Sequence, residues 1–206
     1  MRDDVCNVIR ERIVNLYYKP GDTLNEKRLS EEFKLSRTPI REALIRLSGE
    51  KLVVLVARVG ARVSDVNLRD FQKLIELRET LERGVARLAS LNITEEEIRN
   101  LEKLREMANH GSGEDISELI NYDMQFHQII NRASHNHFLH ESISVIQNQF
   151  FRIQRLISHK PERLLADLPK IIQALKRKDS ERMEELMVEH VEHFVRAVGR
   201  SFLLRR

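Results

Sequence analysis

The sequence predicts a mostly helical fold, in which three short helices and a β-hairpin precede a larger all-helical bundle. Three observations support this prediction. Apolar residues recur at helical spacing through most of the 206 residues, one stretch rich in β-branched residues follows residue 52, and only four prolines and seven glycines are present. A period of 3.6 residues predicts amphipathic helices, whereas β-branched residues around a turn predict paired strands.

The composition is typical of a globular protein that does not enter a membrane. Apolar residues make up 41% of the chain and charged residues 33%. No stretch approaches the roughly 20 consecutive apolar residues that a membrane helix requires. Cys6 is the only cysteine, which excludes an intrachain disulfide and indicates a reducing compartment. The charged N-terminus carries no secretion signal, so we expect a cytoplasmic protein without a membrane partner.

Local signals place the elements of the first third of the chain. Pro20 and Gly21 break the chain after the first apolar-periodic segment. Asn25 is suited to cap the next helix, because its side chain accepts hydrogen bonds from backbone amides at a helix start. The predicted elements are helices over 5–16, 25–33 and 37–49 and a hairpin between residues 52 and 66, with Arg58-Val59-Gly60 at its turn.

The remaining two thirds of the chain show helical periodicity alone. Thr94 and Glu97 have the spacing of a capping box, which marks one helix start. The change of pattern near Ser64 and Asp65 predicts two domains, one over 1–65 and one over 66–206. The helices predicted in the second domain cover about 67–91, 94–109, 114–133, 137–158, 162–178 and 180–203.

The third predicted helix has two chemically different faces. One face is apolar and is formed by Ile40, Ala43, Leu44 and Leu47. Another sector carries Arg37, Thr38, Arg41, Ile45 and Ser48. Arginine presents paired donors to guanine, and phosphate oxygens accept hydrogen bonds at a helix start. A helix that contacts base edges in the major groove and an ordinary solvated amphipathic helix both fit this pattern.

The net charge of +3 is concentrated in the predicted first domain. Residues 1–65 hold 13 lysines and arginines against 10 aspartates and glutamates, and the rest of the chain is neutral. A basic domain attached to a neutral one favours contact with nucleic acid, although a solvated basic surface would have the same composition.

The string RLSEEFKLSRTPIREALIRLSGEKLV closely resembles the helix-turn-helix of the GntR regulators, in particular their FadR-type branch. PGDTLNEKRLSEEF upstream and VARVGARV downstream extend the resemblance over residues 5–64. It implies that residues 1–65 form a winged helix-turn-helix that binds a double-stranded DNA operator. Two departures are visible: Lys34 stands where a glycine is usual, and Gly49-Glu50-Lys51 reorders the usual Glu-Gly.

The resemblance also implies which residues contact DNA. In that family the recognition helix contacts DNA, and the tip of the hairpin enters the minor groove. The matching positions in this sequence are Arg28, Arg37, Thr38, Arg41, Arg58 and Gly60. We add Lys27 as a phosphate contact, which would contribute affinity without sequence preference. Family members bind palindromes as dimers, so we expect a homodimer that places two recognition helices on symmetric half-sites.

Polar residues interrupt the apolar faces of the second domain. Arg78 lies on an apolar face, Asp123 and His127 share a face one turn apart, and His190 lies on an apolar face of the last helix. Buried polar groups must be paired or bound to a metal. An aspartate and two histidines can converge on a divalent cation, whereas an Asp–His hydrogen bond and a satisfied core histidine explain the same spacing. Arg78 requires an anion, which suggests a small organic acid as effector.

Residues 66–206 resemble, more loosely, the helical C-terminal domain of the same branch. The resemblance rests on ELRETLERGVARLA, DMQFHQIINRASHNHFL and RMEELMVEHVEHF. Many members of that branch bind a metal through an Asp-x-x-x-His pair and two further histidines. Asp123, His127 and His190 match three of those positions. The resemblance therefore implies a divalent metal site, for zinc or nickel.

The remaining ligand position of that metal site departs from the family pattern. It falls near Leu168, which cannot coordinate a metal. Either a water molecule, a neighbouring residue or the effector's carboxylate completes the site, or the site is a relic. Asp167 and His193 are the neighbouring residues that could take the place of the missing ligand.

The sequence as a whole predicts a ligand-responsive transcriptional regulator, a repressor rather than an enzyme. The first alternative is a metal-dependent hydrolase-like helical domain, since a metal with an open position can activate water. The chain lacks an HExxH pair, a phosphate loop and a nucleophile elbow. The second alternative is an architectural DNA binder without an effector, against which the inward position of Arg78 argues.

Overall fold

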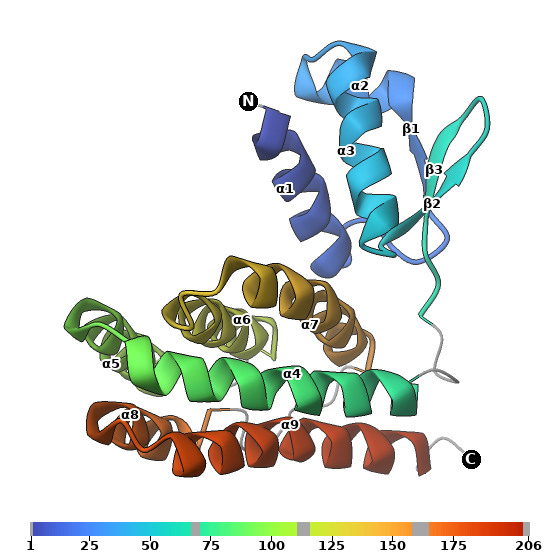
Figure 1. Cartoon of the computed structure of the whole chain (residues 1–206). Helices are drawn as coiled ribbons and strands as arrows, with labels where there is room; N and C mark the ends of the chain where they lie inside the picture. Colours follow the sequence, from blue (N-terminus) through green and yellow to red (C-terminus); the bar gives the residue numbers. More distant parts are fainter. Residues whose placement is uncertain (1, 67–70, 111–115, 158–164, 204–206) are drawn as a thin grey trace. The chain divides into compact units, whose positions relative to one another are not determined.

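The computed structural model describes residues 2–66, 71–110, 116–157 and 165–203 of the chain. They form two compact units (Figure 1). The first unit contains residues 1–68 together with 148–156, and the second contains the rest. The prediction of a mostly helical fold with a small antiparallel sheet is confirmed. None of the helices in the described ranges is both long and apolar enough to span a bilayer.

The first unit has the predicted order of three helices and a hairpin, with one additional strand. Its helices and strands are α1 (Arg2–Val14), β1 (Thr23–Asn25), α2 (Glu26–Phe33), α3 (Arg37–Gly49), β2 (Val53–Val56) and β3 (Gly60–Val63). Helices α1 and α3 pack through fully buried side chains such as Ile9, Ile13 and Leu44. Helix α1 ends two residues earlier than predicted, and Leu16 then adopts a left-handed conformation at φ 58°.

The tight link between α2 and α3 follows from its caps. The side chain of Asn25 accepts hydrogen bonds from the backbone amides of Lys27 and Arg28 at 3.0 and 3.2 Å, which confirms the predicted N-cap. Lys34 ends α2 in the left-handed conformation at φ 54°. This is the position where the resemblance expects glycine, the residue that adopts a positive φ without steric cost.

Strand β1 was not predicted, and its position in the sheet explains why residue 60 is a glycine. Strand β3 lies between β1 and β2 in an antiparallel sheet, and Asn25 pairs with Gly60. A Cβ atom on Gly60 would lie 2.3 Å from the carbonyl oxygen of Leu24, and its φ is +136°. Strand β1 has only three residues, too few to show a period of two, so the sequence pattern could not reveal it.

The second unit is an all-helical bundle. Its elements are α4 (Phe71–Asn92), α5 (Glu95–His110), α6 (Ile116–Ala133), α7 (His137–Ile157), α8 (Leu168–Arg177) and α9 (Ser180–Leu203), and residues 148–156 of α7 are grouped with the first unit. Helices α4 and α9 lie side by side along much of their length (Figure 1). The core contains Phe126, Leu101 and Leu186, all with no exposed surface.

Local signals in the sequence located some helix ends of this unit and missed others. The capping box at α5 is present, because Thr94 and Glu97 bond to each other's backbone amides. His135, after α6, has a left-handed φ of 51°. Residues 165–167, which were predicted to lie within a helix, form a turn, and α8 begins at Leu168. The predicted helix starts at 67, 114 and 162 and the predicted end at 158 lie outside the described residues.

Candidate functional site

The two faces predicted for α3 are present in the structure. The apolar stripe is buried, with Ile40, Ala43, Leu44 and Leu47 at most 2% exposed. On the other sector, Arg37, Thr38, Arg41 and Ile45 are exposed and Ser48 is half-buried. In the part of the chain that the structure describes, neither Arg37 nor Arg41 has an ion-pair partner within the molecule. Both guanidinium groups are therefore available to an external acceptor.

Other predicted DNA contacts lie on α2 and on the hairpin. Lys27 and Arg28 are exposed in the first turn of α2. Arg58 is exposed at the turn between β2 and β3 and has a positive φ of 64°. Gly60, by contrast, is buried between β1 and β2. The close approach of Leu24 requires a glycine there whether or not the residue contacts DNA.

The second candidate site is a buried cluster in the helical unit. Asp123 and His127 from α6 and His190 from α9 each offer one ligand atom, and these atoms all lie within 4.8 Å of one another. His190 Nε2 lies 3.0 Å from Asp123 Oδ1. The ring of Phe126 packs against the rings of both histidines, at centroid distances of 5.0 and 5.3 Å. The structure thus brings together the three residues that were predicted from the sequence as metal ligands.

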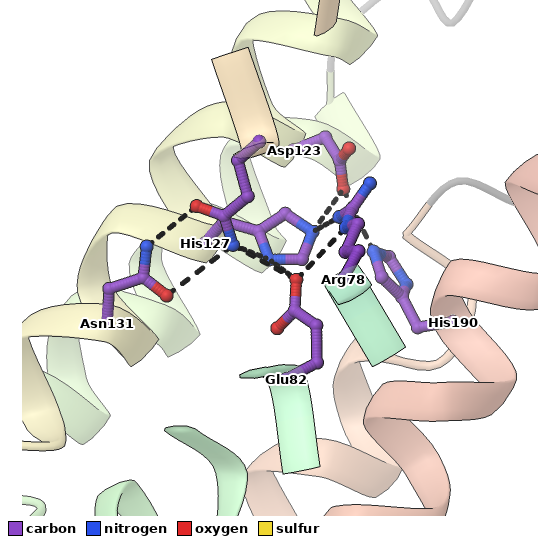
Figure 2. A network of polar contacts seen from close by, with 7 residues as sticks. Arg78, Glu82, Asp123, His127, Asn131 and His190 are labelled. Carbon is purple, nitrogen blue, oxygen red and sulfur yellow. Dashed lines mark hydrogen bonds and ion pairs between the residues drawn. The ribbon is translucent and has the colours of Figure 1, made fainter. Parts of the chain in front are cut away.

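Further polar side chains surround His127 (Figure 2). Arg78 Nη2 lies 2.9 Å from His127 Nε2, and Arg78 Nε donates to Glu82 Oε1 at 3.1 Å. Gln147 Nε2 donates to the same Glu82 oxygen at 3.0 Å and also lies 3.2 Å from His127 Nδ1. Asn131 joins the network by donating to Gln147 Oε1 at 2.7 Å. All five of these side chains are buried.

The hydrogen bonds assign the tautomer of His127. Both ring nitrogens face a donor group, Arg78 Nη2 at 2.9 Å from Nε2 and Gln147 Nε2 at 3.2 Å from Nδ1, and a neutral ring accepts at only one of them. The guanidinium is nearer and charged, so we assign the lone pair to Nε2, which accepts from Arg78. Nδ1 then carries the proton and faces Glu82 Oε1 at 3.5 Å. Burial, together with the positive charge of Arg78, holds the pKa of His127 well below its ordinary value, so the ring stays neutral.

These residues fit a metal ion. His127 Nε2 lies 3.9 Å from Asp123 Oδ1, and a neutral imidazole is the form that coordinates metals. Its Nδ1–H faces a carboxylate, which is the arrangement that orients metal-binding histidines in many proteins. One carboxylate and two imidazoles suit zinc or nickel better than calcium or magnesium, which prefer oxygen ligands.

The position of the fourth ligand is occupied by apolar packing. Leu168 is 1% exposed and belongs to the hydrophobic core of the unit. The two substitutes considered from the sequence, Asp167 and His193, pair with each other. His193 Nδ1 lies 2.9 Å from Asp167 Oδ2, although the two atoms are not aligned for a hydrogen bond. Among the described residues, neither belongs to the Asp123, His127 and His190 cluster.

Three members of the network were not predicted from the sequence. Glu82 and Asn131 each lie one helical turn after a predicted site residue, at four positions from Arg78 and from His127. That spacing could have identified them, because residues four apart share a helix face. Gln147 on α7 has no such signal, since it reaches Glu82 from 65 positions away in the chain. The anion that Arg78 requires is thus supplied within the molecule by Glu82.

Two family models match the chain. The model described as "Bacterial regulatory proteins, gntR family" matches residues 2–63, and the FCD domain model matches residues 73–193. Among solved structures, E. coli McbR/YncC is similar with a TM-score of 0.83 and 25% identity, covering 98% of each chain.

Curated relatives resemble the chain over most of their length. The Uxu operon transcriptional regulator of Escherichia coli K12 is 31% identical over 219 residues, covering 92% of this chain and 83% of the relative. The gluconate operon transcriptional repressor of Bacillus subtilis is 31% identical over 185 residues, covering 85% of this chain and 75% of the relative. The repressor RspR of Escherichia coli K12 is 26% identical over 202 residues, covering 96% and 89%.

Proposed function

This chain belongs to the GntR family of bacterial regulatory proteins and carries an FCD domain, and from that premise we propose that it is a ligand-responsive repressor. As a member of this family it is a DNA-binding transcriptional regulator. The exposed arginines of α3 carry the proposal, because they are solvent-accessible on a helix whose apolar stripe is fully buried. Two of the relatives are repressors, which supports the direction of regulation.

We propose that the protein binds a palindromic operator as a homodimer. A single recognition helix contacts too few base pairs to define one site in a genome, and two-fold symmetry doubles the contacts. Large apolar side chains exposed on α4 support a contact between copies through the helical unit. Leu77 is 46% exposed and Leu91 is 49% exposed.

The experiment that tests the proposal is an operator selection with purified protein. We expect the parent to select a palindrome, and Arg41→Ala to relax specificity at one position per half-site at a cost of about 1–3 kcal/mol. Lys27→Ala is the matched comparison, because loss of a phosphate contact weakens binding to every sequence equally. An unchanged motif for Arg41→Ala would remove Arg41 from the base-contacting residues, and a motif without symmetry would contradict the dimer.

The cluster in the helical unit supports the proposal of a divalent metal, zinc or nickel, and a small organic acid as effector. Asp123 and Glu82 are two negative charges and Arg78 one positive charge, all buried. A divalent ion would change the net charge of these three groups from −1 to +1. The carboxylate of one effector molecule would then bring the net charge to zero. In addition, Glu82 Oε2 is buried without a hydrogen-bond partner among the described residues, so a hydroxyl group on the acid would find an acceptor there.

The effector proposal predicts a thermal shift. A hydroxycarboxylic acid at 100 times its dissociation constant should stabilise the protein by about 2.7 kcal/mol, which raises the melting temperature by several degrees. The shift should require added zinc or nickel, because the carboxylate would complete the coordination sphere. The corresponding alcohols at the same ionic strength are the control. A panel of hydroxy acids and sugar acids that leaves the melting temperature unchanged would favour an effector of another class.

The effector would act on DNA binding through α4. This helix carries both Arg78 and Glu82 and is the first described element after β3 in the chain. A change in the position of α4 would alter the spacing of two recognition helices in a dimer. We propose a coupling of about 1–3 kcal/mol between effector and operator, the range of measured allosteric couplings. Operator affinity measured with and without the acid gives this quantity directly.

A further inference from the structure

One nitrogen atom belongs both to the candidate metal site and to the ion pair beside it. His127 Nε2 lies 3.9 Å from Asp123 Oδ1, within the cluster that His190 completes. The same atom lies 2.9 Å from Arg78 Nη2 and accepts its hydrogen bond (Figure 2). A nitrogen with one lone pair can accept from a guanidinium or coordinate a metal, but not both.

A second hydrogen bond, from the Nε atom of the same guanidinium, holds Arg78 in this position. Its Nε donates to Glu82 Oε1 at 3.1 Å, one turn further along α4, and the two side chains are 4% and 0% exposed. Glu82 is in turn fixed by Gln147, which donates to the same oxygen. The guanidinium is therefore directed at His127 by a buried carboxylate that is not one of the three candidate ligands.

We infer that Arg78 is a built-in cation that closes the metal site, so that a divalent ion and the Arg78 guanidinium compete for His127 Nε2. The inference rests on the metal site of the proposed function and adds a regulatory element to it. Metal binding then requires Arg78 to turn away from His127 while Glu82 retains its charge. A carboxylate ligand that pairs with Arg78 in the turned position would favour the metal-bound form, which links the two ligands.

If Arg78 competes with the metal, its removal changes metal affinity in the opposite direction from the removal of a residue that supports a ligand. A residue that merely orients a ligand weakens metal binding when it is removed, by about 10–100-fold for such partners. Removal of Arg78 should instead strengthen metal binding, because the lone pair of His127 is released. The sign of the change in zinc affinity therefore separates the two roles.

The experiment measures zinc affinity of the full-length protein by competition with a chromophoric chelator near neutral pH. Arg78→Met should bind zinc about tenfold tighter or more, the equivalent of one hydrogen bond to a charged group. The double variant Arg78→Met/Glu82→Gln removes one positive and one negative charge, so the net charge of the site equals that of the parent. The amide oxygen that Glu82→Gln introduces would still accept from His127 Nδ1–H. The double variant should therefore show the same gain if occupancy of the lone pair, rather than net charge, is the cause.

The matched control is Arg83→Met, an exposed arginine on the same helix, which should leave zinc affinity unchanged. Circular dichroism checks that each variant is folded. If Arg78→Met alone does not fold, the zinc affinity of the double variant decides whether the inference holds. Equal or weaker zinc binding by the double variant, when the parent binds zinc, overturns the inference and leaves the metal site standing. Absence of zinc binding in the parent and in both variants overturns the metal site and the inference together, whereas binding by the variants alone supports both.

Discussion

Replacement of Gly60 by alanine should lower the free energy of unfolding of the first unit by about 3 kcal/mol or more. Two independent costs add at this position. The φ of +136° lies in a region that residues with a side chain rarely adopt, and the new Cβ would lie 2.3 Å from the backbone oxygen of Leu24. Backbone cannot move aside as a flexible side chain does, so β1 and β3 must separate. DNA binding should be lost with the sheet.

Hydrogen exchange of the amides in α3 and β3 is the appropriate measurement, because it reports the first unit separately from the helical one. The matched control is Gly49→Ala at the end of α3, where no heavy atom lies within 4 Å of the added Cβ. That variant should be unchanged or stabilised by up to about 1 kcal/mol, since alanine favours the helix. Similar protection in both variants would show that the sheet tolerates a side chain at residue 60.

Replacement of His190 by alanine should abolish stoichiometric metal binding, with a loss of affinity of more than about 100-fold. Loss of a residue that only hydrogen-bonds to a metal ligand costs about 10–100-fold, and His190 would itself be one of three protein ligands. The same substitution removes the hydrogen bond to Asp123 and leaves a buried carboxylate without that partner. Some loss of stability is therefore expected as well, of about 1–3 kcal/mol.

Metal content of purified protein, measured by mass spectrometry after exposure to zinc or nickel, checks this result. His137→Ala is the control, because His137 is exposed at the start of α7.

Leu168→His tests the fourth ligand position by adding a ligand instead of removing one, and it should tighten metal binding if an imidazole there reaches the ion. If both His190→Ala and Leu168→His retain the metal content of the parent, the ion is not bound at this cluster. Asp123 and His190 would then form only a structural hydrogen bond.

The elements of the first unit could be predicted because their signals are local. The apolar stripe on α3 repeats every three to four residues, and the Asn25 cap involves amides only two and three positions away. Strand β1 escaped prediction for the opposite reason. Its pairing with β3 joins residues 23–25 to residues 60–62, and three residues carry too little pattern to indicate a partner so distant.

The candidate metal residues could also be selected from the sequence, but their state could not. Burial of Arg78, Asp123, His127 and His190 follows from their places on apolar helix faces. Their pairing does not follow, because Arg78 meets His127 across 49 positions and His190 meets Asp123 across 67. The sequence suggested that Arg78 needs an external anion, whereas the fold provides Glu82.

The sequence by itself determined the helical periods, the caps, the basic first domain and the polar residues that must lie inside. Only the tertiary structure decided which of those polar residues meet. It paired Asp167 with His193 and kept both out of the cluster, and it brought Gln147 from α7 to the carboxylate of Glu82. The physical reason is that periodicity fixes the direction of a side chain on its own helix. Its partner depends on how several helices pack, and packing depends on shape and volume over the whole core.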